Sequence, residues 1–75
     1  MMDDFSSIID KHFYMSDGGR IYSDIINSIE KSVIIKALEQ TDGNQLRTSR
    51  LLGVNRNTLH KKILRYSIDV RRFKR

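Results

Sequence analysis

GNQLRTSRLLGVNRNTLHKKILRY, residues 43–66, is the stretch that decides how this chain folds. Its pattern predicts two short helices around a tight turn. Asn44 stands where the first helix needs an N-cap, and Gly53 follows its last leucine, where glycine takes a left-handed conformation without steric cost. Val54 is expected to pack inward, and Asn55 to cap the second helix. That second helix presents an apolar stripe at spacings of four and three: Leu59, Ile63 and Tyr66.

The remaining faces of the second predicted helix are polar and basic. They carry Arg56, Asn57, Thr58, His60, Lys61, Lys62 and Arg65. A helix, a turn containing glycine and a basic helix together form the pattern of a helix-turn-helix, whose second helix directs its first turn at base edges in the major groove. Arginine can pair with guanine and asparagine with adenine, so Arg56 is expected to contact a base. Asn55 fits a cap better, and Thr58 fits either a cap or a phosphate contact.

GNQ at residues 43–45 and LLGVNRNTLHKKI at residues 51–63 resemble the DNA-binding domain shared by the nucleoid protein Fis and by NtrC-type activators of sigma-54 polymerase. The resemblance runs from about residue 21 to residue 68, and RNTLHKKI is closer to the NtrC-type version. It implies an all-α, four-helix Fis-like domain, with two N-terminal dimerisation helices followed by the helix-turn-helix. It also implies contacts with bases or flanking phosphates for Asn55, Arg56, His60 and Lys61, and with the DNA backbone for Asn44 and Arg47.

Further phosphate contacts are expected at two places. Gln45, Arg47 and Thr48 lie near the start of the first motif helix, where backbone N–H groups and the helix dipole favour an anion. Lys61, Lys62 and Arg65 would position the protein on the duplex without reading its sequence. The predicted DNA-binding set is Asn44, Gln45, Arg47, Asn55, Arg56, Asn57, Thr58, His60, Lys61, Lys62 and Arg65.

The sequence departs from the family pattern at two places. Thr48 and Ser49 stand where the family has two alanines, so a looser crossing of the two motif helices is expected. Ser67 stands where a glycine ends the last helix, so we expect that end to fray or to take a different cap.

Two longer helices are predicted before the motif, at about residues 4–15 and 20–41. Asp3 or Asp4 is expected to cap the first, residues 16–19 form a linker with two glycines, and Gly43 is the expected left-handed cap of the second. An apolar stripe follows the second helix at helical spacing: Tyr22, Ile25, Ile26, Ile29, Val33, Ala37 and Leu38. The stripe is widened by Ile21, Ile34 and Ile35.

This apolar surface exceeds what the short motif helices can cover. We expect an isologous homodimer interface made of Phe5, Ile8, Ile9, Phe13, Ile21, Ile25 and Ile29. Such a dimer would place two recognition helices in successive major grooves of a palindromic duplex site. The alternative is a monomer in which the first helix folds back over the second.

Charge is distributed unevenly along the 75 residues, which are expected to form one small domain. Residues 1–43, the dimerisation helices, carry four basic and eight acidic side chains, whereas residues 44–75 carry ten basic side chains and Asp69 alone. The helix-turn-helix occupies residues 44–68. Residues 69–75 are expected to be a mostly disordered basic tail, with Val70 and Phe73 as isolated apolar points. The tail either lies over nearby phosphates or is simply the end of the polypeptide.

Catalytic and metal sites are not indicated. The chain has no cysteine, and neither His12 nor His60 has a second ligand at local spacing, so no metal site and no cofactor are expected. No nucleophile has a base partner, so we expect neither an enzyme nor a small-molecule substrate. No apolar run is long enough for a membrane span and no signal peptide is present, so we expect a cytoplasmic protein.

The expected function is sequence-specific binding of duplex DNA by a homodimer, as the DNA-binding domain of a bacterial sigma-54-dependent transcriptional activator. By resemblance, the parent protein would carry a separate ATPase domain. The alternatives are a free-standing Fis-like nucleoid protein that bends DNA and, less favoured, a protein-interaction module. RNA binding is disfavoured because only Tyr66 and Phe73 supply aromatic rings in the basic half.

Overall fold

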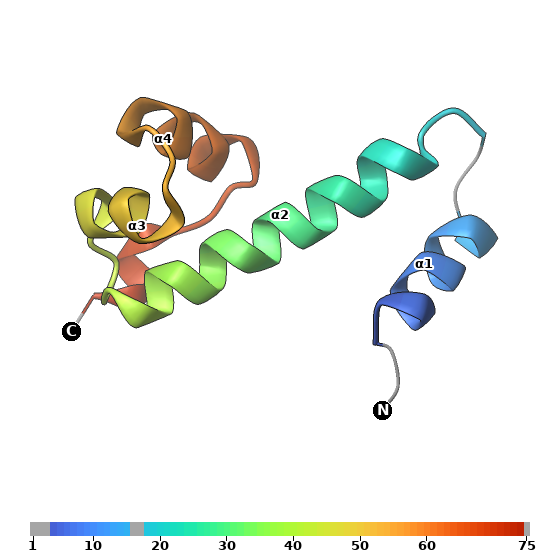
Figure 1. Cartoon of the computed structure of the whole chain (residues 1–75), viewed down its shortest axis with the longest axis horizontal. Helices are drawn as coiled ribbons and strands as arrows, with labels where there is room; N and C mark the ends of the chain where they lie inside the picture. The colour runs from blue at the N-terminus through green and yellow to red at the C-terminus, as the bar shows by residue number, and fades with distance from the viewer. Residues whose placement is uncertain (1–3, 16–17, 75) are drawn as a thin grey trace. The chain divides into compact units, whose positions relative to one another are not determined.

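In a computed structural model, which describes residues 4–15 and 18–74, the chain is all-α (Figure 1). Helix α1 spans Asp4–Met15, α2 spans Ile21–Gln40, α3 spans Gln45–Leu52 and α4 spans Arg56–Arg65. A short 3-10 helix, η1, follows at Val70–Phe73. The predicted four-helix, all-α fold is confirmed. The predicted cap Asp3, the linker positions Ser16 and Asp17, and the last residue Arg75 lie outside the described residues.

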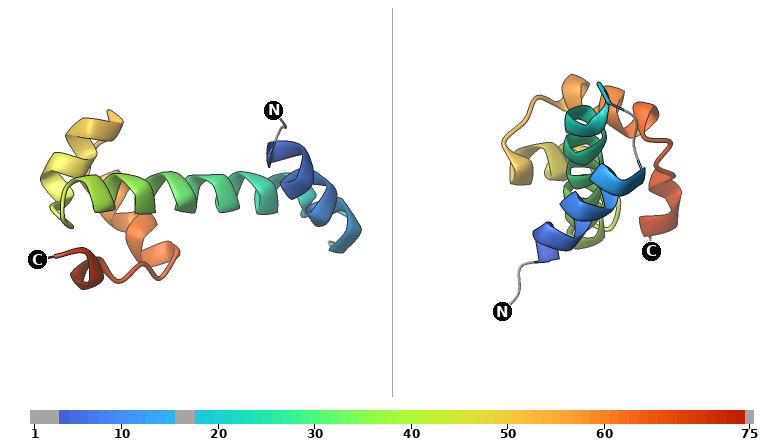
Figure 2. Two further views of the ribbon diagram at one scale, coloured as in Figure 1. Left: turned by 90° about the horizontal axis from the view of Figure 1, so that it is seen from below. Right: turned by 90° about the vertical axis from the view of Figure 1, so that its right-hand side faces the viewer.

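The chain forms two compact units, Met1–Glu30 and Lys31–Arg75. Helix α2 is continuous (Figure 2) and contributes its first half to one unit and its second half to the other. A single-domain organisation therefore stays a prediction, as do the expected domain boundaries.

The core of the second unit is built from one face of α2 and one face of α4. Its buried residues are Ile34, Leu38, Leu59 and Ile63, and the side chains packed against them are Leu52, Tyr66, Ile68, Val70 and Phe73. Leu38 and Leu59 are 0% and 1% exposed. Replacing either leucine by alanine would cost about 2–5 kcal/mol of stability, because it removes apolar contacts and leaves a cavity.

The face of α2 that enters this core differs from the predicted stripe. Ala37 and Leu38 are buried as expected, but Val33 is 46% exposed, and Ile34 is buried in its place. Successive helical residues are about 100° apart, so Ile34, Ala37 and Leu38 share one face of the helix, and Val33 lies beyond the edge of that face. The interpretation of Val33 as core and Ile34 as its edge was wrong. Val54 is also 40% exposed and does not pack inward as predicted.

Helices α2, α3 and α4 end in the same way. In each, a backbone N–H bonds back to a carbonyl five residues earlier: Gly43 to Leu38 at 2.9 Å, Val54 to Ser49 at 3.0 Å, and Ile68 to Ile63 at 3.0 Å. The residue before each donor is left-handed, and these residues are Asp42 (φ 54°), Gly53 (φ 73°) and Ser67 (φ 54°). This is the Schellman arrangement, which satisfies carbonyls that the helix leaves unbonded.

Two of these three ends use a residue other than glycine. Gly53 is left-handed as predicted. Gly43 is left-handed too, with φ 82°, but Asp42 before it takes the position that the motif reserves for glycine. Ser67 adopts the conformation of the glycine that it replaces, and its N–H bonds to the Leu64 carbonyl at 3.1 Å. The expected fraying or change of cap at this end is therefore wrong.

Thr48 and Ser49 are accommodated inside the motif. Thr48 is 0% exposed; its hydroxyl donates to the Asn44 carbonyl at 2.8 Å and lies 2.7 Å from the Thr41 hydroxyl. Ser49 is 4% exposed and donates to the Leu46 carbonyl at 2.8 Å. Because both hydroxyls are hydrogen-bonded, neither adds an unsatisfied polar group to the core. Thr48 also ties α3 to the end of α2 through Thr41.

The C-terminal residues 69–74 are ordered, so the prediction of a mostly disordered tail was wrong for them. Asp69 caps η1 by accepting the Arg71 backbone N–H at 3.1 Å and the Arg71 Nε–H at 3.2 Å. That side-chain hydrogen bond lowers the pKa of the Asp69 carboxyl. Val70 and Phe73, three residues apart, fall on one side of a 3-10 turn, and both pack against the core. Figure 2 shows η1, in red, beside the end of α2.

Helix α1 exposes large apolar side chains in the first unit. Phe5 and Phe13 are 60% and 61% exposed, and Tyr14 is 91% exposed. His12 is half-buried, with Nδ1 2.9 Å from the Ile8 carbonyl and Nε2 3.4 Å from the Ser28 hydroxyl. Within the part of the chain that the structure describes, no helix is long and apolar enough to cross a membrane. The same residues contain no cluster of potential metal ligands.

Candidate nucleic-acid interface

The two motif helices are capped as the sequence predicts. Asn44 Oδ1 accepts the Arg47 N–H at 3.0 Å at the start of α3. Asn55 Oδ1 accepts the N–H groups of Asn57 at 2.7 Å and of Thr58 at 3.4 Å at the start of α4. The Asn44 bond fixes the first turn of α3, and the Asn55 bonds fix the first turn of α4 and its junction with the preceding turn. Asn55 therefore has a structural role, and its predicted DNA contact stays a prediction.

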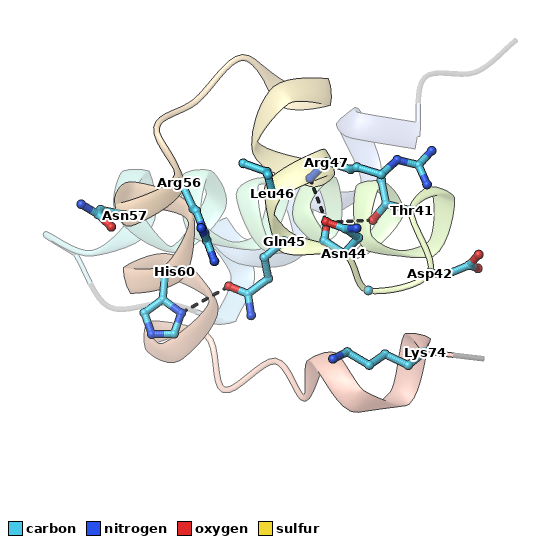
Figure 3. A pocket seen from close by; sticks show the side chains of 11 residues that line it. Thr41, Asp42, Asn44, Gln45, Leu46, Arg47, Arg56, Asn57, His60 and Lys74 are labelled. Atoms are coloured by element: carbon cyan, nitrogen blue, oxygen red, sulfur yellow. Dashed lines mark hydrogen bonds between the residues drawn. The ribbon is translucent and has the colours of Figure 1, made fainter.

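A cavity of about 900 Å³ opens where the ends of these helices meet (Figure 3). Its walls come from the α2–α3 turn, the first turn of α3, one side of α4 and Lys74. Six members of the predicted DNA-binding set line it: Asn44, Gln45, Arg47, Arg56, Asn57 and His60. The fold therefore brings side chains that are up to 16 positions apart in the sequence into one concave surface.

One contact across the cavity joins the two motif helices. His60 Nδ1 of α4 lies 3.3 Å from Gln45 Oε1 of α3 (Figure 3). An amide oxygen only accepts, so His60 donates through Nδ1 in this arrangement, and Nε2 is left for another partner. Gln45, predicted as a phosphate contact, thus also orients His60. The sequence did not indicate this pairing, because it depends on the angle between the helices.

A second group of the predicted residues lies along another side of α4. Thr58, Lys61, Lys62 and Arg65 line a hollow of about 360 Å³. Their spacings of three and four place them on one face of the helix. Helix α4 thus presents two polar sides, while Leu59 and Ile63 anchor it in the core. Of the predicted set, only Asn55 lines neither hollow.

The charge of the main cavity favours an anion. Its lining residues include three cations, Arg47, Arg56 and Lys74, and one acid, Asp42. Figure 3 shows the Asp42 carboxylate pointing away from Arg56 and His60. Cations gathered in a concave surface attract and hold polyanions more strongly than the same charges dispersed. Lys74 was not among the predicted residues, because residues 69–75 were interpreted as disordered.

Two capped short helices, joined by a glycine turn and bearing a cationic surface, define a helix-turn-helix protein. The chain belongs to the Fis family of bacterial regulatory proteins, whose family model matches residues 25–66.

The chain is similar to Fis-like proteins and to transcriptional regulators. A putative Fis-like DNA-binding protein of Neisseria meningitidis is 38% identical over 48 residues, which cover 64% of this chain and 61% of that protein. The DNA-binding transcriptional regulator NtrC of Bradyrhizobium is 48% identical over 52 residues, covering 69% of this chain and 11% of the regulator. DNA-binding protein Fis of Buchnera aphidicola is 34% identical over 53 residues, covering 71% of this chain and 54% of that protein. The chain thus spans less than two thirds of each relative. No solved structure matches it significantly.

Proposed function

We propose that this chain binds duplex DNA sequence-specifically as a homodimer, and that it is the DNA-binding domain of a bacterial sigma-54-dependent transcriptional activator. The observation that carries DNA binding is the convergence of six predicted contact residues on one cationic cavity at the start of α4. Such a protein acts on DNA in the bacterial cytoplasm.

Within this proposal, the two sides of α4 have different tasks. Arg56 and Asn57 belong to the first turn, where a recognition helix meets base edges. Lys61, Lys62 and Arg65 lie further along and are suited to phosphates, which supply affinity and strong salt dependence. Thr58 lines the same hollow as these cations, which favours a phosphate contact for its hydroxyl.

The choice of an activator over a nucleoid protein rests on sequence identity. Three NtrC regulators are 42–48% identical to the chain and the regulator AtoC is 40% identical, whereas a Fis-like protein and a Fis protein are 38% and 34% identical. The second candidate, a free-standing DNA-bending protein, is supported by those Fis-like relatives. A bending measurement with circularly permuted DNA fragments separates the two candidates, because a nucleoid protein of this kind would bend non-cognate duplexes strongly.

The homodimer is supported by the apolar surface of the first unit. Phe5 and Phe13 are more than half exposed, and Ile9 is 39% exposed. Ile8, Ile21, Ile25 and Ile29 are half-buried. A second copy using the same patch would remove these side chains from water, at about 25 cal/mol for each Å² of apolar area. It would also supply the second recognition helix that a palindromic site requires.

Titration of duplex DNA into the chain at two salt concentrations tests DNA binding itself. We expect a steep loss of affinity with salt, weaker binding to RNA of equal sequence, and a two-fold symmetric site when the bound DNA is selected from a random pool. Salt-independent association, or no association, would support the alternative of a protein-interaction module.

A further inference from the structure

We propose that residues 69–74 belong to the DNA-contacting surface, and that Lys74 binds a backbone phosphate at the main cavity, which Arg47 and Arg56 also line. This inference rests on the proposed binding of duplex DNA. It assigns a contact to a segment that begins three residues after the family match ends at residue 66.

The segment is held in place by packing at both ends of η1. Val70 and Phe73 contact the core cluster of α2 and α4. The Lys74 N–H donates to the Arg71 carbonyl at 3.3 Å, which continues the turn to the last described residue. Lys74 is therefore carried by an anchored backbone, and placing its charge near a phosphate costs less conformational entropy than it would from a mobile tail.

Close approach to Gly43 places Lys74 at the cavity. A Cβ atom on Gly43 would lie 3.0 Å from the Val70 carbonyl oxygen and 3.1 Å from Lys74 Cγ. The missing side chain of Gly43 thus makes room for the segment beside the α2–α3 turn. From there the Lys74 side chain lines the same cavity as Asn44, Gln45 and the two arginines (Figure 3).

The other basic residues of the segment, Arg71 and Arg72, do not line the cavity. Arg71 pairs with Asp69 at 3.2 Å, so its charge is partly compensated, and it does not line the cavity. Lys74 and Arg56 enter the cavity from different sides, Lys74 from the end of η1 and Arg56 from α4 (Figure 3). The Lys74 ammonium is a compact donor suited to a phosphate oxygen. Its contact would strengthen binding to any sequence, because the phosphate carries no base information.

The test compares Lys74→Gln with the matched control Arg71→Gln in the full chain. Both remove one positive charge from the same segment. Titrations use a selected site and a random duplex at 50 and 200 mM salt. We expect Lys74→Gln to weaken both duplexes alike and to lower the slope of log affinity against log salt by about 0.9. The ratio of wild-type affinity to Lys74→Gln affinity should therefore be about 3.5-fold smaller at 200 mM salt than at 50 mM salt. Arg71→Gln should keep the wild-type slope.

A second pair of variants tests whether docking matters. Phe73→Ala removes the apolar anchor without changing charge, and circular dichroism checks that the helices remain. We expect Phe73→Ala to lower the slope of log affinity against log salt by as much as Lys74→Gln does. The double variant, Phe73→Ala with Lys74→Gln, should lower that slope no further than either single change.

Three outcomes would overturn the inference. Lys74→Gln and Arg71→Gln could change the affinity and its salt slope equally, the double variant could lower the slope by the sum of the two single effects, or Lys74→Gln could weaken binding to the selected site alone. Each of these presupposes that the wild-type chain binds duplex DNA. Absence of wild-type binding would instead remove the proposed function, and this inference with it.

Discussion

Ser67→Gly should stabilise the protein, because Ser67 completes the end of α4 in a conformation that disfavours side chains. Its φ is 54°, and both hydrogen bonds of the Schellman arrangement are present, Ser67 N–H to Leu64 and Ile68 N–H to Ile63. The packing of Ile63 and Ile68 in one apolar cluster holds this geometry. The left-handed conformation costs an L-residue roughly 1–2 kcal/mol.

Glycine removes that cost but increases the entropy of the unfolded chain by about 0.4–1 kcal/mol. The net gain expected for Ser67→Gly is therefore about 0.5–1 kcal/mol. For a domain of this size, that gain corresponds to a rise in Tm of roughly 2–8 °C. Thermal unfolding followed by circular dichroism at 222 nm, together with urea titration, measures both quantities.

Gly53→Ser is the matched reverse change at the end of α3. Gly53 occupies the same position of the same motif, with φ 73°, and an added Cβ would meet no atom within 4 Å outside the adjoining backbone. Its cost therefore comes from the backbone alone and should have a similar size and opposite sign. A Tm that stays constant or falls in Ser67→Gly, while Gly53→Ser is destabilised as expected, would refute the reasoning for α4.

Three further predictions concern recognition, assembly and pH. Arg56→Ala should cost about 1–3 kcal/mol of specific affinity and relax the preference at one base pair per half-site; unchanged discrimination among point variants of a selected site would remove Arg56 from the base readers. Phe13→Glu should dissociate the proposed dimer in sedimentation equilibrium, whereas the control Tyr14→Glu should not, because the neighbouring Tyr14 is outside the proposed interface and 91% exposed. A wild-type chain that is already monomeric would contradict the interface. The Arg71 hydrogen bond holds the pKa of Asp69 below its ordinary value of 3.8, so the Asp69 cap stabilises η1 above that pH and is lost as pH falls through the lowered pKa. The chemical shift of the Arg71 backbone amide should change in the wild type as the Asp69 cap is lost. If the same change persists in Asp69→Asn, a group other than Asp69 causes it.

Local rules were enough to predict the motif. The caps Asn44 and Asn55 and the turn at Gly53 depend on residues within three positions of each other, and the structure has all three as expected. The all-α class followed from helical periodicity over long segments. All of the predicted contacts except Asn55 line one of two hollows, and none of them is buried. On α4 this follows from the sequence, because Leu59 and Ile63 face the core and turn the polar residues outward.

Features that depend on tertiary packing were not predictable in the same way. Helix α2 is apolar on more than one side, so its sequence did not distinguish Ile34 from Val33 as the core residue. The two apolar side chains of η1 are too few to establish a periodicity, and their order comes from the core that receives them. Lys74 reaches the cavity only because Gly43 lets the backbone of the segment approach.

The docked C-terminal segment also decides how this domain can be tethered to something larger. A polypeptide joined at the C-terminal end would follow closely on Lys74, which lines the proposed DNA surface. A cargo protein or affinity tag attached there, without a long linker, should therefore obstruct the duplex.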